Sequence, residues 1–261
     1  MEFLPKNEQQ KVRALSSRQE RLQQGRFLAE GKKLCLEALA SDMSIEYVVL
    51  KEGADEESKL IADSFETTGI EVFQAGTNGF ERMTDAVHPQ DIFCVIDLPN
   101  ESNDISFNRF LALDAINDPG NLGTIIRTAD WFGINHIVIG GTSADPYNPK
   151  TLRASMGSVF RMNFHIEEHL SDFINTYKNE HPDSSIFGFD VHAEHSLSEI
   201  KKIPSSWGLI LGSESHGISP NTQKAITDNI RIPGIGKAES LNVGIATGIA
   251  LYHMCTLADT Q

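Results

Sequence analysis

The sequence predicts an α/β protein with two domains: a small α/β domain over residues 1–100 and a parallel-sheet α/β domain over residues 108–261. Strand-like and helix-like patterns alternate along the whole chain. Residues 99–106 are polar and rich in turn formers, which is typical of a domain linker. In the second half, a strand, a polar loop and a helix follow one another three times. A chain of 261 residues is long enough to bury a sizeable core in this arrangement.

The first domain shows both the helical and the strand periodicity. Residues 9–24 form a polar, helix-like segment, and helices are also predicted over residues 31–40, 57–66 and 79–87. Runs rich in β-branched and aromatic residues, such as IEYVVL, predict strands over residues 45–50, 71–74 and 91–98. These elements together predict a small α/β unit.

The second domain alternates strands with helices throughout. Strands are predicted over residues 110–116, 136–139, 160–166, 185–189, 209–212 and 229–233. Helices are predicted over residues 123–132 and 149–157, and a last one ends near residue 258. Because a helix between two strands returns the chain across the sheet, the alternation predicts a parallel sheet.

Composition excludes several classes of protein. Hydrophobic residues make up 40% of the chain and charged residues 22%, as in ordinary globular proteins. No apolar run approaches the roughly 18 residues that span a bilayer, and residues 1–13 lack the apolar core of a signal peptide. We therefore expect a cytoplasmic protein without a membrane segment. Cys35, Cys94 and Cys255 are scattered without a CxxC pattern, which predicts buried reduced thiols and no metal site.

The distribution of charge points to a specific polyanion partner. The net charge of −14 argues against a protein that coats nucleic acid, because an acidic surface repels phosphate. Residues 1–33, however, carry eight basic side chains against four acidic ones. A basic end on an acidic body is suited to the recognition of one RNA site.

The first of the three loops reads DPGNLGTIIR and covers residues 118–127. The apolar residues of the helix that follows lie on one face, and Arg127 lies off that face. In open α/β sheets, ligands bind at the carboxyl ends of the strands, where this loop is expected. Taken alone, a capped helix with a solvated arginine explains the segment as well. A nucleotide phosphate loop is not predicted, since neither GxxxxGK[ST] nor GxGxxG is present.

The second loop, GSESHG over residues 212–217, follows the strand-like run WGLIL. Glu214 is placed to anchor an arginine by a bidentate pair, and Gly212 would let the backbone approach a ligand closely. An ordinary strand-to-helix turn explains this loop equally well on its own. Histidine is a candidate proton acceptor in many active sites, but we interpret His216 as a bystander.

The third segment, residues 229–251, is harder to explain by packing alone. A strand-like NIRIP enters a glycine-bearing loop that ends at Ser240 and Asn242, where a small-residue helix begins. Both polar residues have cap or turn roles as an alternative. Gly244, Ala246 and Gly248 share one helical face, which is suited to close packing against another helix.

In order, spacing and residue types, the three loops together resemble the motifs of the SpoU (TrmH-type) RNA 2′-O-ribose methyltransferases over about half of the chain. The resemblance implies a deep trefoil knot in the C-terminal domain, bound S-adenosylmethionine and a homodimer; generic topology rules do not predict a knot. It implies catalytic roles for Asn121, Arg127, Glu214, Ser240 and Asn242. Many relatives carry serine at the position of Gly244, a departure that concerns local helix packing.

The same resemblance implies how the cofactor and the RNA are held. Backbone at Gly212, Ile232 and Leu241 would hold the cofactor, and Arg153 matches a basic position that reaches RNA phosphate or the partner subunit. The segment RFLAEG at residues 26–31 resembles a ribosomal-protein-type RNA-binding domain, and we expect four basic residues before it to contact phosphates. These are Lys11, Arg13, Arg18 and Arg21.

We expect transfer of a methyl group to a ribose 2′-OH, without a metal, with large-subunit ribosomal RNA as the substrate in preference to transfer RNA. Arginine stays protonated in proteins, so Arg127 is expected to organise the phosphate and the hydroxyl, with a role as base only if its contacts perturb it. Two other classes remain open from the sequence: a noncatalytic RNA- or ribosome-binding module, and a nucleotide hydrolase. A titration that compares the binding of S-adenosylmethionine with that of ATP distinguishes these classes from a methyltransferase.

Overall fold

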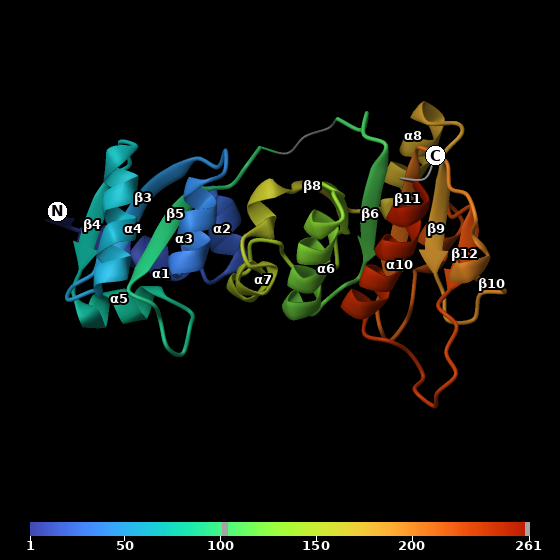
Figure 1. The fold of residues 1–261 in the computed structure, drawn as a ribbon. Coiled ribbons are helices and arrows are strands. Elements are labelled where there is room, and N and C mark those ends of the chain that lie inside the picture. Colours follow the sequence, from blue (N-terminus) through green and yellow to red (C-terminus); the bar gives the residue numbers. More distant parts are fainter. Residues whose placement is uncertain (101–103, 259–261) are drawn as a thin grey trace. The chain divides into compact units, whose positions relative to one another are not determined.

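The computed structural model describes residues 1–100 and 104–258, and its elements are labelled in Figure 1. Residues 101–103, within the predicted linker, lie outside the described residues. The chain forms two compact units, one made of residues 1–100 with 145–160 and the other of the remaining residues. No helix among the described residues is long and apolar enough to cross a membrane.

The first unit is built on a five-stranded mixed sheet in the order β1-β4-β3-β5-β2. The strands β1, β4 and β3 run parallel, and β5 is antiparallel to both β3 and β2. The strands are β1 (Glu2–Phe3), β2 (Arg26–Glu30), β3 (Ile45–Lys51), β4 (Val72–Ala75) and β5 (Ile92–Asp97). The helices are α1 (Lys6–Ala14), α2 (Arg18–Gln24), α3 (Lys32–Leu39), α4 (Glu56–Thr67), α5 (Thr77–Met83) and α7 (Pro149–Ser155).

Two details of this unit differ from the predictions. The helix predicted over residues 9–24 is two helices, because the chain turns at residues 15–17 before Ser17 starts α2. Strand β2, to which the sequence analysis assigned no element, pairs with β5 along its whole length.

Residues 145–160 follow the predicted first strands of the second domain but pack within the first unit. The ring of Tyr147 lies 4.7 Å from that of Phe27 in β2, between centroids. Asp145 accepts hydrogen bonds from the guanidinium of Arg21, one of them from Nε at 3.0 Å. Aromatic and charged contacts therefore hold this excursion on β2 and α2, which local sequence patterns do not indicate.

The second unit is a seven-stranded sheet whose pairs are all parallel, which confirms the predicted parallel sheet. Its order is β10-β12-β9-β11-β6-β7-β8. The strands are β6 (Arg109–Asp114), β7 (His136–Gly140), β8 (Asn163–Glu167), β9 (Ser185–Phe189), β10 (His195–Ser196), β11 (Trp207–Gly212) and β12 (Asp228–Arg231). The helices are α6 (Pro119–Trp131), α8 (Leu170–Glu180), α9 (Pro220–Gln223) and α10 (Val243–Ala258), and a short 3₁₀ turn is η2 (Leu197–Glu199). A further 3₁₀ turn, η1 (Ser158–Arg161), lies where the chain passes from the first unit to the second.

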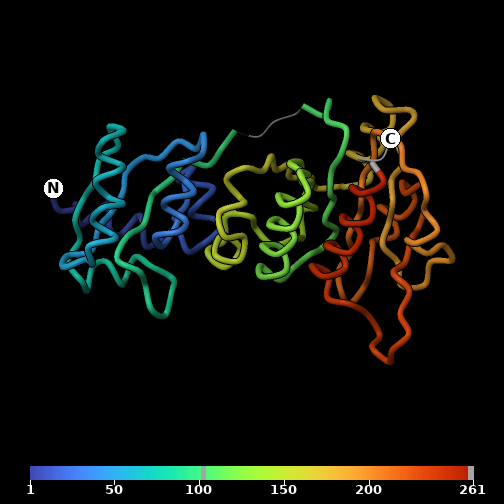
Figure 2. Tube along the Cα trace, viewed as in Figure 1, coloured from blue at the N-terminus to red at the C-terminus, as the bar shows by residue number. Residues whose placement is uncertain are grey.

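Two strands at the centre of this sheet position the site. In the register of β6 and β11, Asp114 lies opposite Gly212, so the loops that leave these strands begin side by side. Helix α10 packs on α6, which brings the start of α10 to the same edge. The connection from β12 to α10 extends beyond the edge at which β6 and β9 end, as Figures 1 and 2 show.

Candidate functional site

Three side chains, one from each of the three loops, form a hydrogen-bonded triangle at the carboxyl edge of the parallel sheet. Asn121 Nδ2 donates to Glu214 Oε1 at 3.1 Å. Asn242 Nδ2 donates to Asn121 Oδ1 at 2.8 Å and lies 3.3 Å from Glu214 Oε1. These residues are far apart in sequence, so the fold alone brings them together. We call this group the amide triangle.

Asn121 is positioned by the start of α6. Asp118 is the N-cap, and its side chain accepts a hydrogen bond from the backbone N–H of Asn121 at 2.9 Å. Pro119 occupies the first turn, where its missing N–H costs nothing and its φ suits the helix. The cap holds the backbone of Asn121, so its side chain is free to point toward the other two loops.

Glu214 lies in a tight turn after β11. Ser213 and Gly217 exchange two backbone hydrogen bonds across the turn, at 3.0 and 2.9 Å. Gly212 cannot be replaced easily, because a Cβ there would lie 2.2 Å from the carbonyl carbon of Gly217. Glu214 was expected to anchor an arginine, but the structure shows it accepting hydrogen bonds from two asparagine amides instead. His216 is exposed and contacts the hydroxyl of Ser215 at 2.8 Å.

Asn242 has two functions through the two ends of its side-chain amide. Its Oδ1 accepts from the backbone N–H groups of Gly244 at 2.9 Å and Ile245 at 3.3 Å, which caps the start of α10. Its Nδ2 belongs to the amide triangle. A Cβ at Gly244 would lie 2.8 Å from Thr124 Cγ2, so glycine lets α10 approach α6 closely. The small-residue face of α10 is therefore occupied within the chain.

Two of the predicted site residues are not part of the triangle. Arg127 lies two turns into α6, is exposed, and makes no hydrogen bond or ion pair with the described residues. Ser240 is exposed in the loop before α10 and likewise bonds to none of the described residues. Both side chains are available to a ligand from solvent.

The loop from β12 to α10 carries free backbone groups. Within the described residues, none of the backbone N–H or C=O groups of residues 233–241 has a hydrogen-bond partner. Ile232 is half-buried, and Leu241 is 45% exposed beside the triangle. Free backbone groups next to apolar side chains suit a flat heterocycle that needs both stacking and hydrogen bonds. S-adenosylmethionine carries such a group, so these residues fit it.

The four predicted phosphate contacts in the first unit divide into three kinds. Arg13 and Arg18 are exposed and unpaired within the described residues, on either side of the turn between α1 and α2. Lys11 is exposed and lies 3.3 Å from Glu8. Arg21 is only 2% exposed, pairs with Asp145 and donates to the carbonyls of Leu15 and Ser16.

The prediction for Arg21 was therefore wrong, since the side chain is buried and all three nitrogens of its guanidinium donate hydrogen bonds inside the protein. Arg153 is half-buried in α7, and its Nη2 lies 3.1 Å from Asp85 Oδ2. Its Nη1 is buried without a hydrogen-bond partner among the described residues. Arg153 would have to leave Asp85 to reach a phosphate.

The chain is similar to known proteins over most of its length. Residues 108–252 match the model of the SpoU rRNA methylase family, and residues 7–94 match that of the MRM3-like substrate binding domain. The 23S rRNA (guanosine(2553)-2′-O)-methyltransferase RlmP of Bacillus subtilis is 33% identical over 92% of this chain and 92% of its own. A TrmH-family protein of Porphyromonas gingivalis superposes with a TM-score of 0.84 at 34% identity, covering 96% of this chain and 98% of its own.

An AdoMet-bound rRNA methyltransferase of Sinorhizobium meliloti is also similar. It superposes with a TM-score of 0.83 at 28% identity and covers 97% of this chain and 95% of its own. The similarity in both cases extends over both compact units and is not confined to the parallel sheet.

Proposed function

The chain belongs to the SpoU rRNA methylase family, and we propose that it methylates one ribose 2′-OH of large-subunit ribosomal RNA. It is an S-adenosylmethionine-dependent RNA 2′-O-methyltransferase with the fold of that family. The amide triangle is the main support for this proposal, because it joins at one edge of the sheet the three loops that the reaction needs. Relatives named as 23S rRNA methyltransferases support the choice of RNA.

Gly212, Ile232 and Leu241 are the residues that would hold the cofactor. The turn at Gly212 has no room for a side chain, and the loop that follows Ile232 offers unpaired backbone groups. When bound, S-adenosylmethionine supplies an electrophilic methyl group on a sulfonium. The protein then has to orient the ribose and exclude competing nucleophiles at that edge.

Arg127 is the residue that we assign to the target nucleotide. A guanidinium remains protonated at neutral pH, so it holds a phosphate or the 2′-hydroxyl by hydrogen bonds and favours the developing alkoxide. Its exposed side chain has no partner among the described residues that must be displaced first. Asn121, Glu214 and Asn242 position the three loops, and Ser240 is the nearest hydroxyl in the sequence to the cap of α10.

Lys11, Arg13 and Arg18 are proposed to contact RNA phosphates. Arg13 and Arg18 are the stronger contacts, because neither has to give up an ion pair within the described residues. To contact a phosphate, Lys11 gives up its exposed ion pair with Glu8, and the loss of such a pair costs little free energy. We expect Arg153 to be a weaker contact, since its ion pair with Asp85 must break before it can bind a phosphate or a second subunit.

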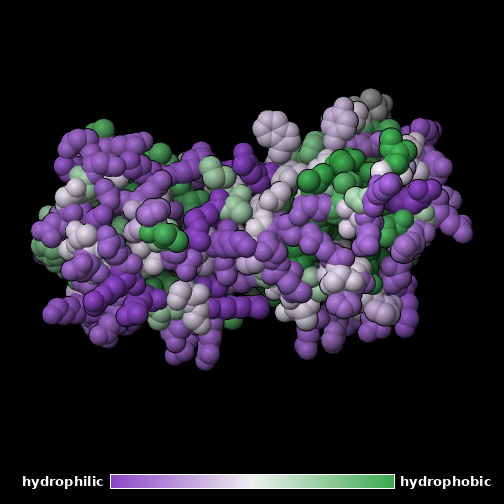
Figure 3. All heavy atoms as spheres, turned by 90° about the horizontal axis from the view of Figure 1, so that it is seen from below, coloured by the Kyte–Doolittle hydropathy of each residue, from purple (hydrophilic) through white to green (hydrophobic). Residues whose placement is uncertain are grey.

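We also propose a homodimer through the second unit. The small-residue face of α10 is used against α6, so we assign the dimer contact to the exposed face of this helix. Ile245, Ile249 and Tyr252 follow helical spacing and are 57%, 40% and 67% exposed, and Trp131 at the end of α6 is 84% exposed. Figure 3 shows hydrophobic residues gathered over the second unit on an otherwise hydrophilic face. An exposed apolar surface of this kind marks an interface.

The trefoil knot and a cytoplasmic location complete the proposal; both rest on the family and on the ribosomal substrate.

The test uses purified protein, labelled S-adenosylmethionine, and either unmodified ribosomal RNA fragments or bulk transfer RNA. Label on a ribose of ribosomal RNA supports the proposal. Label in transfer RNA would replace the substrate and keep the enzyme class. No label in any RNA, with the cofactor bound, would favour a binding module.

A further inference from the structure

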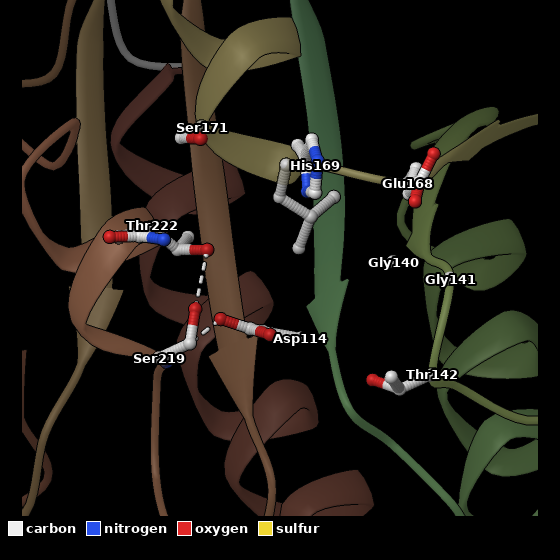
Figure 4. Close-up of a pocket in the computed structure, with 11 residues that line it drawn as sticks. Asp114, Gly140, Gly141, Thr142, Glu168, His169, Ser171, Ser219 and Thr222 are labelled. Carbon is white, nitrogen blue, oxygen red and sulfur yellow. Dashed lines mark hydrogen bonds between the residues drawn. The ribbon is translucent and has the colours of Figure 1, made fainter.

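A polar cavity lies at the carboxyl edge of the parallel sheet, separate from the amide triangle (Figure 4). Its volume is about 110 Å³, and it is walled by the ends of β6, β7 and β8 and by the segment that leads into α9. None of the triangle or proposed cofactor residues lines it. The loops after β6 and β11, however, supply both the triangle and two walls of the cavity, so a ligand here would be joined to the reaction site through two short segments.

The size of the cavity restricts what it can hold. Sites that enclose a whole cofactor or drug-sized ligand have volumes of roughly 300–1,000 Å³. At about 110 Å³, this cavity is too small for S-adenosylmethionine and is of the order of three to four water volumes. It suits one edge of a flat ring that enters from solvent.

Asp114 gives the cavity a fixed hydrogen-bond acceptor. The residue ends β6 and is 9% exposed, and its Oδ2 accepts from the backbone N–H of Ser219 at 2.8 Å. Oδ1 has no partner among the described residues and is not one of the fully buried unpaired atoms, and Asp114 lines the cavity. A buried carboxylate with one open oxygen requires a donor from a ligand or water. Glu168, exposed at the rim, adds a second carboxylate.

The start of α8 offers hydrogen-bond donors to the cavity. Leu170 and Ser171, which begin the eleven-residue helix α8, line it. The N-cap residue His169 makes no side-chain cap hydrogen bond, so the first amides of α8 remain available. The lining therefore presents donors from α8 beside acceptors from Asp114 and Glu168. Two carboxylates disfavour a phosphate in this place.

We propose that this cavity binds the Watson–Crick edge of an unpaired guanine of the RNA substrate. The Watson–Crick edge of guanine carries one hydrogen-bond acceptor, O6, beside two donors, N1–H and N2–H₂. A cavity that offers one donor and two acceptors is complementary to this edge. Adenine, cytosine and uracil each have a single donor group on that edge. Bases that proteins read in RNA are commonly splayed out of the strand and bound by this edge. The inference rests on the proposed function, because it makes the cavity part of RNA recognition.

Mononucleotides test the cavity without any methyl transfer. Guanosine 5′-monophosphate, inosine 5′-monophosphate and adenosine 5′-monophosphate are titrated into the full chain and followed by protein NMR. Inosine lacks only the 2-amino group, so it removes one donor. We expect guanosine monophosphate to bind about ten-fold more tightly than either of the others, the discrimination typical of a paired contact to a base.

Glu168→Gln and Asp114→Asn keep the size of each side chain and remove one charge. Glu180→Gln, at the exposed end of α8, is the matched control. We expect the first two variants to lose the preference for guanosine over inosine and to bind S-adenosylmethionine as the wild type does, and the control to keep the preference. Equal binding of the three nucleotides, or an unchanged preference in both variants, would overturn the inference.

The test of guanine binding and the test of methyl transfer can fail independently of each other. If the wild type transfers no methyl group to RNA but prefers guanosine monophosphate, the cavity stands and the proposed reaction fails. If ribosomal RNA fragments are methylated and guanine-to-inosine replacement at every position leaves KM unchanged, the reaction stands and the cavity is not a guanine site. A rise in KM of about ten-fold at one replaced position supports both.

Discussion

The side-chain amide of Asn242 donates to Oδ1 of Asn121 at 2.8 Å, although the two residues are 121 positions apart in the sequence. Each residue lies at the start of a helix, Asn121 in the first turn of α6 and Asn242 as the cap of α10. The hydrogen bond therefore ties two helix N-termini together at the sheet edge, and Glu214 accepts from both amides. Movement of any one loop would break contacts with the other two.

Asn242→Ala should lose both activity and stability. It removes an N-cap, which costs about 1 kcal/mol, and the two donor contacts of the triangle. Asn242→Asp is the sharper variant, because its carboxylate can still cap α10 but cannot donate to Asn121 and repels Glu214. We expect thermal unfolding closer to wild type for Asn242→Asp than for Asn242→Ala, and loss of methyl transfer in both. Full activity of Asn242→Asp would show that only the cap matters.

Arg127→Ala should abolish turnover and leave folding nearly unchanged. The side chain is exposed and unpaired within the described residues, so its removal should alter the free energy of unfolding by no more than about 0.5 kcal/mol. Arg127→Lys keeps the charge but loses the fork geometry that holds two oxygens. Calorimetry with S-adenosylmethionine should give wild-type affinity for both. Wild-type methylation by Arg127→Ala would remove its assigned role.

A pH prediction follows from a cluster in the first unit. Burial raises the pKa of the Glu8 carboxyl, but hydrogen bonds from Arg26, Tyr47 (2.9 Å) and Lys11 outweigh burial and lower it below the ordinary value of 4.5. A carboxyl whose folded pKa is lowered contributes stability above its unfolded pKa and loses it as pH falls through the folded pKa.

The first unit should therefore become less stable as pH falls below about 4.5, as measured by urea unfolding of the full chain. Glu8→Gln should flatten that dependence. Glu46→Gln is the matched control, since Glu46 also contacts Arg26, at 2.7 Å, but is 42% exposed. An acid transition of equal steepness in Glu8→Gln and the wild type would contradict this account.

The sequence predicted the parts of the site better than their contacts. Asn121, Glu214 and Asn242 each follow a recognisable strand or begin a recognisable helix, so local patterns find them. The partner of Glu214 was predicted incorrectly. The side-chain amides of Asn121 and Asn242 donate to its carboxylate, and no local sequence pattern indicates which side chains will do this. The cavity near Asp114 was missed altogether, since its walls come from segments that meet only in the fold.

Burial was the other property that the sequence did not reveal. Arg13, Arg18 and Arg21 look alike in a basic segment, yet two are exposed and one is 2% exposed. The difference depends on Asp145, which reaches Arg21 from 124 residues away. The all-parallel order of the second sheet, in contrast, follows from helix–strand alternation and needed no long-range information.

The dimer prediction is tested with one charge on the exposed face of α10. Ile249→Asp should convert a dimer into a monomer, because a buried unpaired carboxylate at an interface is costly. Leu60→Asp is the control, since Leu60 is an exposed leucine of α4 in the first unit and is 66% exposed. Light scattering at micromolar concentration gives the mass. A wild type that is already monomeric, or a dimer in the Ile249 variant, would contradict the assigned interface.

The final prediction separates the exposed arginines of the first unit from the buried one. Arg13→Ala and Arg18→Ala should each weaken RNA binding and reduce the slope of log affinity against log salt by about 0.7–0.9, the value of one released counterion. Both should unfold like the wild type, because their side chains are exposed and unpaired within the described residues. Arg21→Ala should instead destabilise the first unit by about 3–5 kcal/mol, since it leaves Asp145 Oδ2 and two backbone carbonyls without the donors that Arg21 supplies. Filter binding between 50 and 200 mM salt, a range over which such slopes are resolved, and urea unfolding measure the two effects. A reduced salt slope with unchanged stability in Arg21→Ala would mean that Arg21 leaves Asp145 to bind phosphate, and would restore it to the RNA surface.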